Sequence, residues 1–439
     1  MQNKLFYWSI TVALGGFLFG FDTAVISGAE QDIQKLWQLG DFMHGLAVAI
    51  ALYGTVVGAL FGGIPADRFG RKKTLIWIGV LYFISALGSA LAPEIYTFMF
   101  FRFIGGLGVG ASSVAAPMYI SEIAPAKRRG GLVALFQFNI VLGILIAYLS
   151  NYLLDGFSNS DWRWMLGVEC APALAYLLMV MGVPESPRWM LVKQGKREAA
   201  LAILRVTDPL QADEDVAAIL ESAKKEAGLP KTSLWSGAFN KPILLAFLFA
   251  FFNQLSGINA IIYYAPRIFE QAGLGKSTAL LSTSGIGLIN LIFTMLGLST
   301  IDKIGRRTLM LIGSVGLIAA LGLVAGVFNG GGMLVPVLLF VFIAFFAMSQ
   351  GAVIWVFISE IFPNKVRAAG QSLGSFTHWL FAAIIANVFP YFANLPGIGP
   401  SKIFAFFCIM MVLQLLYVWR MMPETKGKSL EELEREMVR

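Results

Sequence analysis

The chain has 439 residues, of which 57% are hydrophobic and only 13% carry a charge. Soluble domains carry a charge on about a quarter of their residues, so this composition excludes an ordinary soluble protein and indicates a chain that folds in a lipid bilayer. The net charge of +7 does not favour a nucleic-acid partner, because the lysines and arginines stand in short clusters between long apolar segments. Cys170 and Cys408 both lie inside apolar segments, so we expect no disulfide, no metal site and no cofactor.

Six apolar segments of the first half are long enough to cross a bilayer, which needs about 20 residues of helix. The segment near 5–29 is too long for the core of a signal peptide and contains Asp22, so we expect it to be retained as the first membrane helix. We predict that residues 1–183 form a six-helix bundle, with the other helices near 44–64, 74–92, 96–122, 131–153 and 164–183.

Three ionisable residues, Asp22, Arg102 and Glu169, lie inside these segments, where a charge is expensive and is a functional candidate. Counted from the helix ends at about 1.5 Å per residue, all three lie roughly 10–12 Å below the outer surface, so they can meet. One interpretation is a static ion pair that holds the bundle together. We favour another, in which two carboxylates share one guanidinium and one acid is left suited to bind and release a proton.

The next segment, 184–241, is polar. Residues 196–204 and 213–226 have helical periodicity, and Glu221 and Lys225 have the spacing of an ion pair within a helix. We predict a cytoplasmic linker with short helices that lie under the bundle. A solvated linker with only nascent helix is the alternative.

Six further apolar segments predict a second bundle over 242–422, and residues 423–439 are expected to form a cytoplasmic tail with a helix near 429–437. The fold class is therefore an all-α membrane protein with twelve transmembrane helices in two halves. The segments of the second half lie near 242–266, 278–300, 308–328, 334–361, 368–392 and 402–421.

Three polar motifs at helix ends occur twice, at a nearly constant spacing in the sequence. The repeat includes the whole six-helix half in the same topology, as in transporters whose halves are related by an axis along the membrane normal. We expect a substrate to pass between the halves; two independent bundles that merely share ancestry are the alternative. The pairs are Asp67–Lys73 with Asp302–Thr308, Ser121–Arg129 with Ser359–Arg367, and Pro184–Ser186 with Pro423–Thr425.

Most lysines and arginines fall on the side of the membrane that carries these motifs. The positive-inside rule then predicts a multi-pass protein of the cell membrane with both termini and the 184–241 segment in the cytoplasm. Charged residues of the motifs should pair across helix ends and bias the equilibrium between two conformations. The residues expected to gate transport in this way are Arg71, Glu122 and Arg129, and their copies Arg306, Glu360 and Arg367.

A second group of polar and aromatic residues lies near the middle of the predicted helices. Amide side chains both donate and accept hydrogen bonds, and an indole ring can cover the apolar face of a pyranose, so the group suits a hydroxyl-rich ligand. Each residue alone could instead join two helices, and His378 could be a packing residue. The expected ligand contacts are Gln137, Asn253, Gln254, Asn259, Asn290, Trp355, His378 and Trp379.

No pattern indicates an enzyme. Gly275–Ser277 resembles the end of a phosphate loop, but the glycine required five residues earlier is Glu270 and no strand precedes it. ATP hydrolysis is therefore not expected.

Taken together, the motifs resemble those of the sugar porter family of the major facilitator superfamily, and the resemblance covers essentially the whole chain. It implies a twelve-helix fold that works by alternating access. It further implies that Asp22 and Arg102 couple protons, as in bacterial symporters, and that Glu169 matches an acid of the proton-coupled members. Passive glucose carriers differ at Asp22 and Glu169. The motifs are Asp67–Lys73 with its copy, Arg102–Gly110, Pro117–Glu122 with Arg129 and Gly130, Pro184–Trp189, Gln254–Asn259 and Pro423–Gly427; the implied sugar contacts are Gln137, Gln254, Asn259, Asn290 and Trp355.

Two positions depart from the family pattern. Asn253 stands where the family commonly has glutamine, and His378 stands where relatives often have glutamine or asparagine. Both positions are expected near the sugar, so the class of substrate is a monosaccharide while glucose, galactose and xylose all stay open.

We therefore expect a proton-coupled monosaccharide symporter that works as a monomer in the bilayer. A passive facilitator, which would use Asp22 and Arg102 only structurally, is the first alternative. A sugar sensor that does not transport is less favoured, because such proteins usually carry a long cytoplasmic extension and only about 18 residues follow the last apolar segment here.

Overall fold

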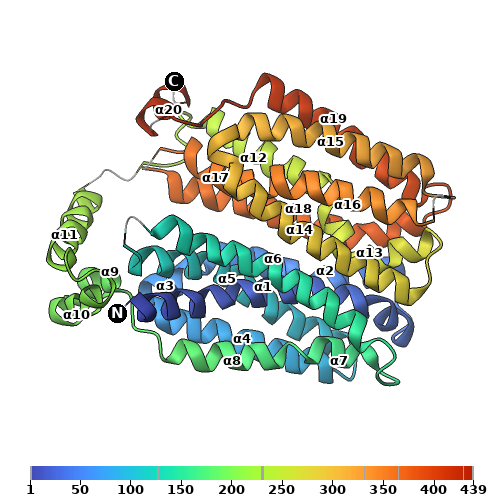
Figure 1. Ribbon diagram of the computed structural model, residues 1–439, viewed down its shortest axis with the longest axis horizontal. Helices are drawn as coiled ribbons and strands as arrows, with labels where there is room; N and C mark the ends of the chain where they lie inside the picture. Colours follow the sequence, from blue (N-terminus) through green and yellow to red (C-terminus); the bar gives the residue numbers. More distant parts are fainter. Residues whose placement is uncertain are drawn as a thin grey trace. The chain divides into compact units, whose positions relative to one another are not determined.

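The computed structural model describes residues 2–125, 128–228, 232–330, 332–363, 365–428 and 430–437. Regular structure in these ranges is helical, and twelve spans are long and apolar enough to cross a membrane (Figure 1). The prediction of an all-α membrane protein with twelve membrane helices is confirmed.

The spans of the first half begin with α1 (Gln2–Leu36), which continues several residues past the predicted end near residue 29. The sixth span is shared by α7 (Asp161–Gly167) and α8 (Cys170–Met181), which are interrupted just before Cys170. The other elements of this half are α2 (Asp41–Phe61), the short α3 (Gly63–Phe69), α4 (Arg71–Leu91), α5 (Ile95–Ile123) and α6 (Arg129–Leu154).

Two spans of the second half are also interrupted. The seventh is shared by α12 (Asn240–Leu255) and α13 (Ile258–Gln271), and the tenth contains a π-helical turn, η2 (Ala347–Gly351), between α16 (Leu334–Phe346) and α17 (Ala352–Ile361). The remaining spans are α14 (Lys276–Ile304), α15 (Arg306–Val327), α18 (Arg367–Asn394) and α19 (Gly399–Arg420).

The linker and tail contain the expected short helices. Besides α10 (Arg197–Thr207), α11 (Ala212–Gly228) and α20 (Leu430–Met437), the linker has α9 (Pro187–Trp189) and the π-helical η1 (Met190–Gln194), which the periodicity did not predict. The linker helices share a small apolar core of Leu191, Ala200, Leu204, Ala212 and Val216, so this segment is folded rather than a solvated linker.

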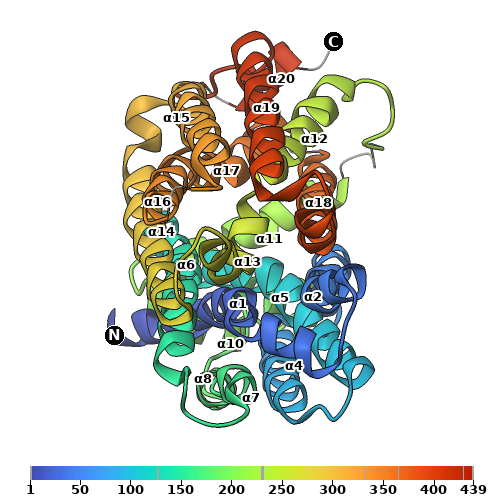
Figure 2. The same cartoon turned by 90° about the vertical axis from the view of Figure 1, so that its right-hand side faces the viewer.

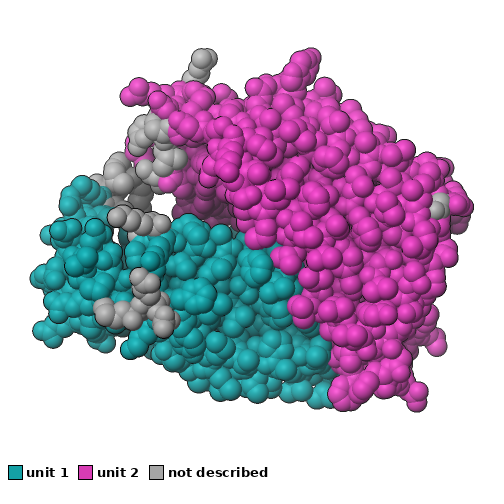
Figure 3. Space-filling view, in the orientation of Figure 1, with its two compact units in different colours: residues 1–22, 54–143, 166–231 teal, residues 23–53, 144–165, 232–439 magenta. Residues whose placement is uncertain are grey.

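Contacts divide the chain into two compact units, coloured in Figure 3. Unit 1 comprises residues 1–22, 54–143 and 166–231, and in it α4 packs against α5 and α8. Unit 2 comprises residues 23–53, 144–165 and 232–439. The predicted division into two six-helix halves at 1–183 and 242–422, with a linker and a tail, rests on the sequence repeat and stays a prediction.

Within unit 2, α15 packs against α16 and α19, and α12 packs against α18 (Figure 2). Large aromatic side chains fill this core, including Phe249 on α12, whose ring stacks on that of Phe357 on α17 at 5.4 Å. Unit 2 also contains the C-terminal part of α1 and the N-terminal part of α2, which therefore pack with helices of the second repeat.

The break between α12 and α13 has a local cause. Gly257 has φ +86°, in the left-handed region that favours glycine, and a Cβ atom at this position would overlap the ring of Phe407. A side chain is therefore excluded both by conformation and by space. The break leaves Asn253 and Gln254 on one helix and Asn259 on the next, in the middle of the seventh span.

Candidate functional site

A buried ion pair joins α1 and α5 inside unit 1. Arg102 donates from Nη1 to Oδ1 of Asp22 at 2.5 Å and from Nη2 to the carbonyl oxygen of Asp22 at 3.0 Å. Asp22 is 2% exposed and Arg102 is 1% exposed. Neither charge is solvated, so each depends on the other for compensation.

Glu169 lies beside this pair, at the point where the chain passes from α7 to α8. It is 1% exposed and interacts electrostatically with both Asp22 and Arg102. Among the described residues, its Oε1 has no hydrogen-bond partner. The structure thus brings together the three residues that the sequence places at one depth, with two carboxylates for one guanidinium.

The close approach of α4 and α5 around this pair depends on a glycine. A Cβ atom on Gly105 would overlap the hydroxyl of Ser85 on α4 and would lie 3.4 Å from Oδ1 of Asp22. A larger residue at 105 would therefore displace Ser85 or move α4 away from α5 beside the pair.

The polar group of unit 2 is centred on Gln254. Its Nε2 donates to Oδ1 of Asn253 at 2.9 Å, and its Oε1 accepts a bond from Nδ2 of Asn259 at 2.6 Å. The same Nε2 lies 3.2 Å from a ring nitrogen of His378 on α18. The break in the seventh span thus places three amides around one point, and α18 adds the imidazole.

Two indole rings flank that imidazole. The ring centroid of His378 is 4.9 Å from that of Trp355 on α17 and 4.7 Å from that of Trp379 on α18. Trp379 is 7% exposed, whereas Trp355 is 37% exposed. Trp355 is the more exposed of the two indole rings.

The other two expected ligand contacts are Asn290 and Gln137. Asn290 lies on α14, where its Oδ1 accepts a bond from the hydroxyl of Thr294 at 3.2 Å. Gln137 is half-buried on α6 and belongs to unit 1. Their contact with a sugar stays a prediction.

Gln350, which no sequence pattern singled out, is 1% exposed in the π-helical turn η2. Its Nε2 lies 3.4 Å from the sulfur of Met411, and its Oε1 has no hydrogen-bond partner in the described part of the chain. π-Helical turns inside α-helices occur often at functional sites. A lone glutamine in an apolar segment was the available signal, but only the turn makes it conspicuous.

The first helix-end motif forms a hydrogen-bonded cluster in unit 1 that consists of Arg71, Glu122, Glu185 and Ser186. We call this cluster, and its copy in unit 2, a bolt. Arg71 holds Glu122 with two hydrogen bonds, from Nε and from Nη2, both at 2.9 Å. Ser186 donates to the same carboxylate at 2.5 Å, and Glu185 accepts the backbone N–H groups of Arg71, Lys72 and Ser186. The start of α4, the end of α5 and the chain after α8 are tied together.

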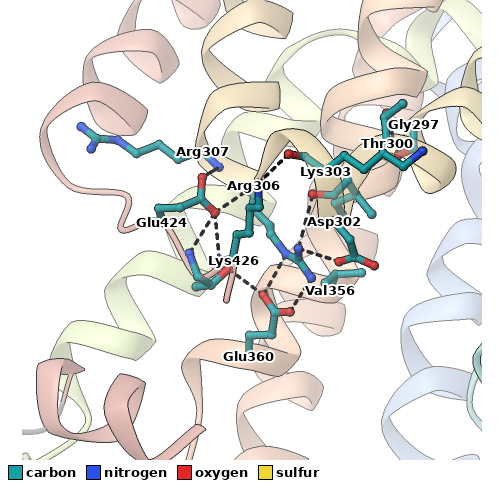
Figure 4. A network of polar contacts seen from close by, with 12 residues as sticks. Gly297, Thr300, Asp302, Lys303, Arg306, Arg307, Val356, Glu360, Glu424 and Lys426 are labelled. Atoms are coloured by element: carbon teal, nitrogen blue, oxygen red, sulfur yellow. Dashed lines mark hydrogen bonds and ion pairs between the residues drawn. The ribbon is translucent and has the colours of Figure 1, made fainter. Parts of the chain in front are cut away.

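The second copy in unit 2 repeats this geometry (Figure 4). Arg306 donates from Nη2 to Glu360 at 2.7 Å and from Nε at 3.2 Å, and Thr425 donates to Glu360 at 2.6 Å. Glu424 accepts the backbone N–H groups of Arg306, Arg307, Thr425 and Lys426.

Two acids of these bolts were not among the expected gating residues. Glu185 and Glu424 belong to the repeated motif that begins with Pro184 and Pro423, so the repeat was the signal that could have identified them. Arg367 donates from Nε to the carbonyl oxygen of Phe362 at 3.2 Å. The side chain of Arg129 lies outside the described part of the structure.

The family model described as "Sugar (and other) transporter" matches residues 8–437. The chain is 39% identical over 435 residues to a D-xylose transporter of Levilactobacillus brevis, with 96% of this chain and 93% of the relative covered. It is 38% identical to an arabinose-proton symporter of Bacillus subtilis, with 97% and 94% covered.

A solved structure is also similar over its full length. The inward open conformation of the xylose transporter XylE from E. coli matches with a TM-score of 0.87 and 34% sequence identity, covering 99% of this chain and 100% of that one.

Proposed function

Since the chain belongs to the sugar transporter family, we propose that it carries a monosaccharide together with a proton across the cell membrane, working by alternating access. The observation that carries the proposal is the buried contact of Asp22 with Arg102, with Glu169 beside it. A passive carrier has no need of two enclosed carboxylates on one guanidinium. The relatives named for D-xylose and arabinose support a pentose, and a hexose is the other substrate class that the site admits.

The pair acts through the charge of Asp22. When Asp22 is ionised it holds Arg102, and a proton bound by Asp22 removes that charge and releases the arginine. The loaded carrier then rearranges with its proton, and the empty carrier returns after Asp22 has lost the proton to the cytoplasm. Glu169 has the supporting role of tuning the charge balance of Asp22 and Arg102.

The sugar binds at the amide cluster of Asn253, Gln254 and Asn259, with His378 and Trp355 beside it. The amides hydrogen-bond to one another in this structure, so sugar hydroxyls exchange for bonds that are already oriented. The accessible indole of Trp355 covers the apolar face of the ring. Gln137, Asn290 and Trp379 complete the proposed contacts.

Both termini and the 184–241 segment lie in the cytoplasm, because the basic residues concentrate on that side. In that orientation the bolts of Arg71 with Glu122 and of Arg306 with Glu360 lie at the cytoplasmic ends of the helices and bias which side of the carrier is open. The carrier works as a monomer.

Uptake into proteoliposomes tests the proposal directly. A panel of pentoses and hexoses is offered with and without an inward proton gradient. Accumulation above the outside concentration that depends on the gradient supports symport. Equilibration that ignores the gradient would establish the passive facilitator instead, and failure to take up any monosaccharide would sink both.

A further inference from the structure

A further buried ion pair in unit 2 consists of residues that the proposed function does not use. Arg267 on α13 donates from Nε to Oε1 of Glu30 at 2.9 Å and from Nη2 to Oε2 at 2.7 Å. The side chain of Glu30 is 0% exposed and that of Arg267 is 12% exposed. Because α1 and α13 come from different halves of the repeat, this two-pronged contact ties the two halves together at one end.

A histidine joins the same carboxylate. Nε2 of His44 on α2 lies 2.7 Å from Oε2 of Glu30, and both side chains are 0% exposed. Three helices therefore meet at one carboxyl group. Tyr264 packs its ring against that of His44 at 6.0 Å and donates its own hydroxyl to the carbonyl oxygen of Ala386 at 2.8 Å.

Gln34, one turn along α1, completes the enclosure by accepting a bond from Nη2 of Arg267 at 2.6 Å. The other charged groups here form a rim toward the helix ends. Asp41 accepts bonds from Gln34 at 3.4 Å and from Asn394 at 2.8 Å.

The rim continues on α13, α14 and the end of α6. Glu270 accepts a bond from Gln31 at 3.0 Å, and Lys276 lies 2.8 Å from Asp155 and 4.0 Å from Asp32. These groups are partly solvated, whereas Glu30 and His44 are enclosed.

We propose that Glu30 and His44 together form a second proton-binding site, and that a proton bound there releases α13 from α1 and α2. The inference rests on the proposed function only for its physiological use, since it concerns a conformational change that occurs without sugar. In the proposed orientation this end of α1 faces the outside, so the proton comes from the outer solution. One O–H or N–H bond forms and no other bond changes.

The release follows from the charge balance. With Glu30 ionised and His44 neutral, the carboxylate balances Arg267 and the enclosed cluster has no net charge. One added proton, on either member of the pair, leaves one positive charge without compensation. A buried unpaired charge is strongly unfavourable, so the state in which Arg267 and His44 reach water becomes favoured.

The consequence for transport is that acidity outside promotes opening to the outside. The effect adds to the coupling at Asp22 but does not require it, because the two clusters share no residue. A carrier with Asp22→Asn therefore keeps a pH-dependent opening at this end.

The test measures access to a buried position beside the cluster. Ile33 is 1% exposed and lies one turn from Glu30 on the same face of α1. The hydrogen bond between Gln34 and Arg267 indicates that this face of α1 is turned toward α13. Ile33→Cys is placed in a background of Cys170→Ser, Cys408→Ser and Asp22→Asn. Labelling by a membrane-impermeant thiol reagent is followed in right-side-out vesicles without sugar.

The labelling rate is normalised to that of Asn159→Cys, an exposed position, so that the pH dependence of the thiol reaction cancels. We expect at least about fivefold faster normalised labelling near pH 5.5 than near pH 8. Glu30→Gln should label fast at both pH values. Glu270→Gln, which removes a rim carboxylate on α13, the helix of Arg267, is the matched control and should keep the pH response.

A pH-independent rate in the Asp22→Asn background, or a Glu30→Gln variant as protected as its parent, overturns the inference. If Glu30→Gln does not fold, His44→Gln tests the same pair, because it removes one of the two proton acceptors. A pH response shifted or lost in His44→Gln supports the site, and an unchanged response contradicts it. Labelling needs no sugar, so its failure is distinguishable from failure of the uptake experiment.

Discussion

The two kinds of buried contact between arginine and carboxylate in the proposed mechanism differ in how fully the carboxylates are bonded. At the helix end of unit 2, both oxygens of Glu360 accept bonds from Arg306 (Figure 4). Thr425 adds a third donor. In the interior of unit 1, Arg102 holds Asp22, while Oε1 of Glu169 has no partner among the described residues. We call the arrangement at Glu360 saturated, because both carboxylate oxygens have hydrogen-bond donors. The arrangement at Asp22 and Glu169 is unsaturated, because Oε1 of Glu169 has no donor among the described residues.

The difference indicates which of the two can exchange a proton. In the helix-end clusters each carboxylate accepts several hydrogen bonds, so the proposed role of these clusters is to hold helix ends together. A carboxylate that shares one guanidinium with another acid has less compensation for its negative charge. In an enclosed site that charge is also not stabilised by water. The contrast supports the proposal that Asp22 exchanges the proton with Glu169 in a supporting role, and that the bolts bias the carrier between its two states.

The largest expected effect comes from neutralising the unsaturated site. Asp22→Asn imitates the protonated acid permanently, so the ratio of internal to external sugar should fall to about 1, the value of passive equilibration. Sugar binding and counterflow exchange should survive, because exchange does not require the empty carrier to reorient. Uptake and counterflow in proteoliposomes measure the two activities.

Glu169→Gln provides the comparison for that result and should weaken accumulation less, because Glu169 has the supporting role. Accumulation that survives in Asp22→Asn would refute the assignment of proton coupling. Loss of both exchange and binding would instead favour a static ion pair.

A smaller effect is expected at the sugar site. Gln254→Ala removes the bonds to Asn253 and Asn259 together with sugar partners, and a lost hydrogen bond in an enclosed site costs about 1–3 kcal/mol, or roughly 5- to 150-fold in Kd. The matched control is Gln414→Ala, which removes a buried amide that bonds Ser314 at 3.0 Å. Binding isotherms should show weaker affinity for Gln254→Ala alone, while thermal unfolding should report similar destabilisation of both. Equal affinities would move the sugar site elsewhere.

Hydropathy was sufficient for the twelve spans because a bilayer imposes one length and one polarity on every crossing helix. The repeat went further. It indicated that charged residues gather at helix ends in each copy, and in the structure Arg71 contacts Glu122 and Arg306 contacts Glu360. The gating role of these residues stays a prediction.

Contacts that depend on the rotation of one helix against a distant one could not be predicted. Glu30 and Arg267 are 237 residues apart, and nothing in either segment specifies that their faces meet. The turn η2 inserts its extra residue without a change in hydropathy, so Gln350 was missed. Gly257 was visible in the sequence, but the overlap with Phe407 that makes it necessary was not.

Neutralising a bolt should have a smaller effect than Gln254→Ala and a larger one than a change in a solvated pair. Glu122→Gln removes the charge that holds Arg71, and we expect the carrier population to shift toward the inward-facing state by a factor on the order of 5 to 30. Accessibility labelling of cysteines on the two sides measures the shift. Asp67→Asn is the control, because Asp67 contacts the same arginine but its side chain is 60% exposed, and solvated pairs contribute little. No shift in Glu122→Gln would mean that these charges serve topology only.

The smallest effect is expected where a pair is fully solvated. Glu221 and Lys225 on α11 lie 2.7 Å apart with side chains 67% and 75% exposed, and the hydrogen bond from Lys225 holds the pKa of Glu221 below its ordinary value. Such a pair stabilises the helix above the pKa of the unfolded chain, and the contribution disappears as the pH falls through the lowered pKa of the folded state. Lys225→Ala should therefore raise the pKa of Glu221 in a carboxyl NMR titration, lower thermal stability slightly at neutral pH and leave it unchanged in acid.

Transport should not change, because neither residue belongs to a bolt or to the buried sites. A transport defect in Lys225→Ala would show that solvated charge on the linker also biases the carrier, and the contrast between saturated and unsaturated buried carboxylates would then be an incomplete account of its control.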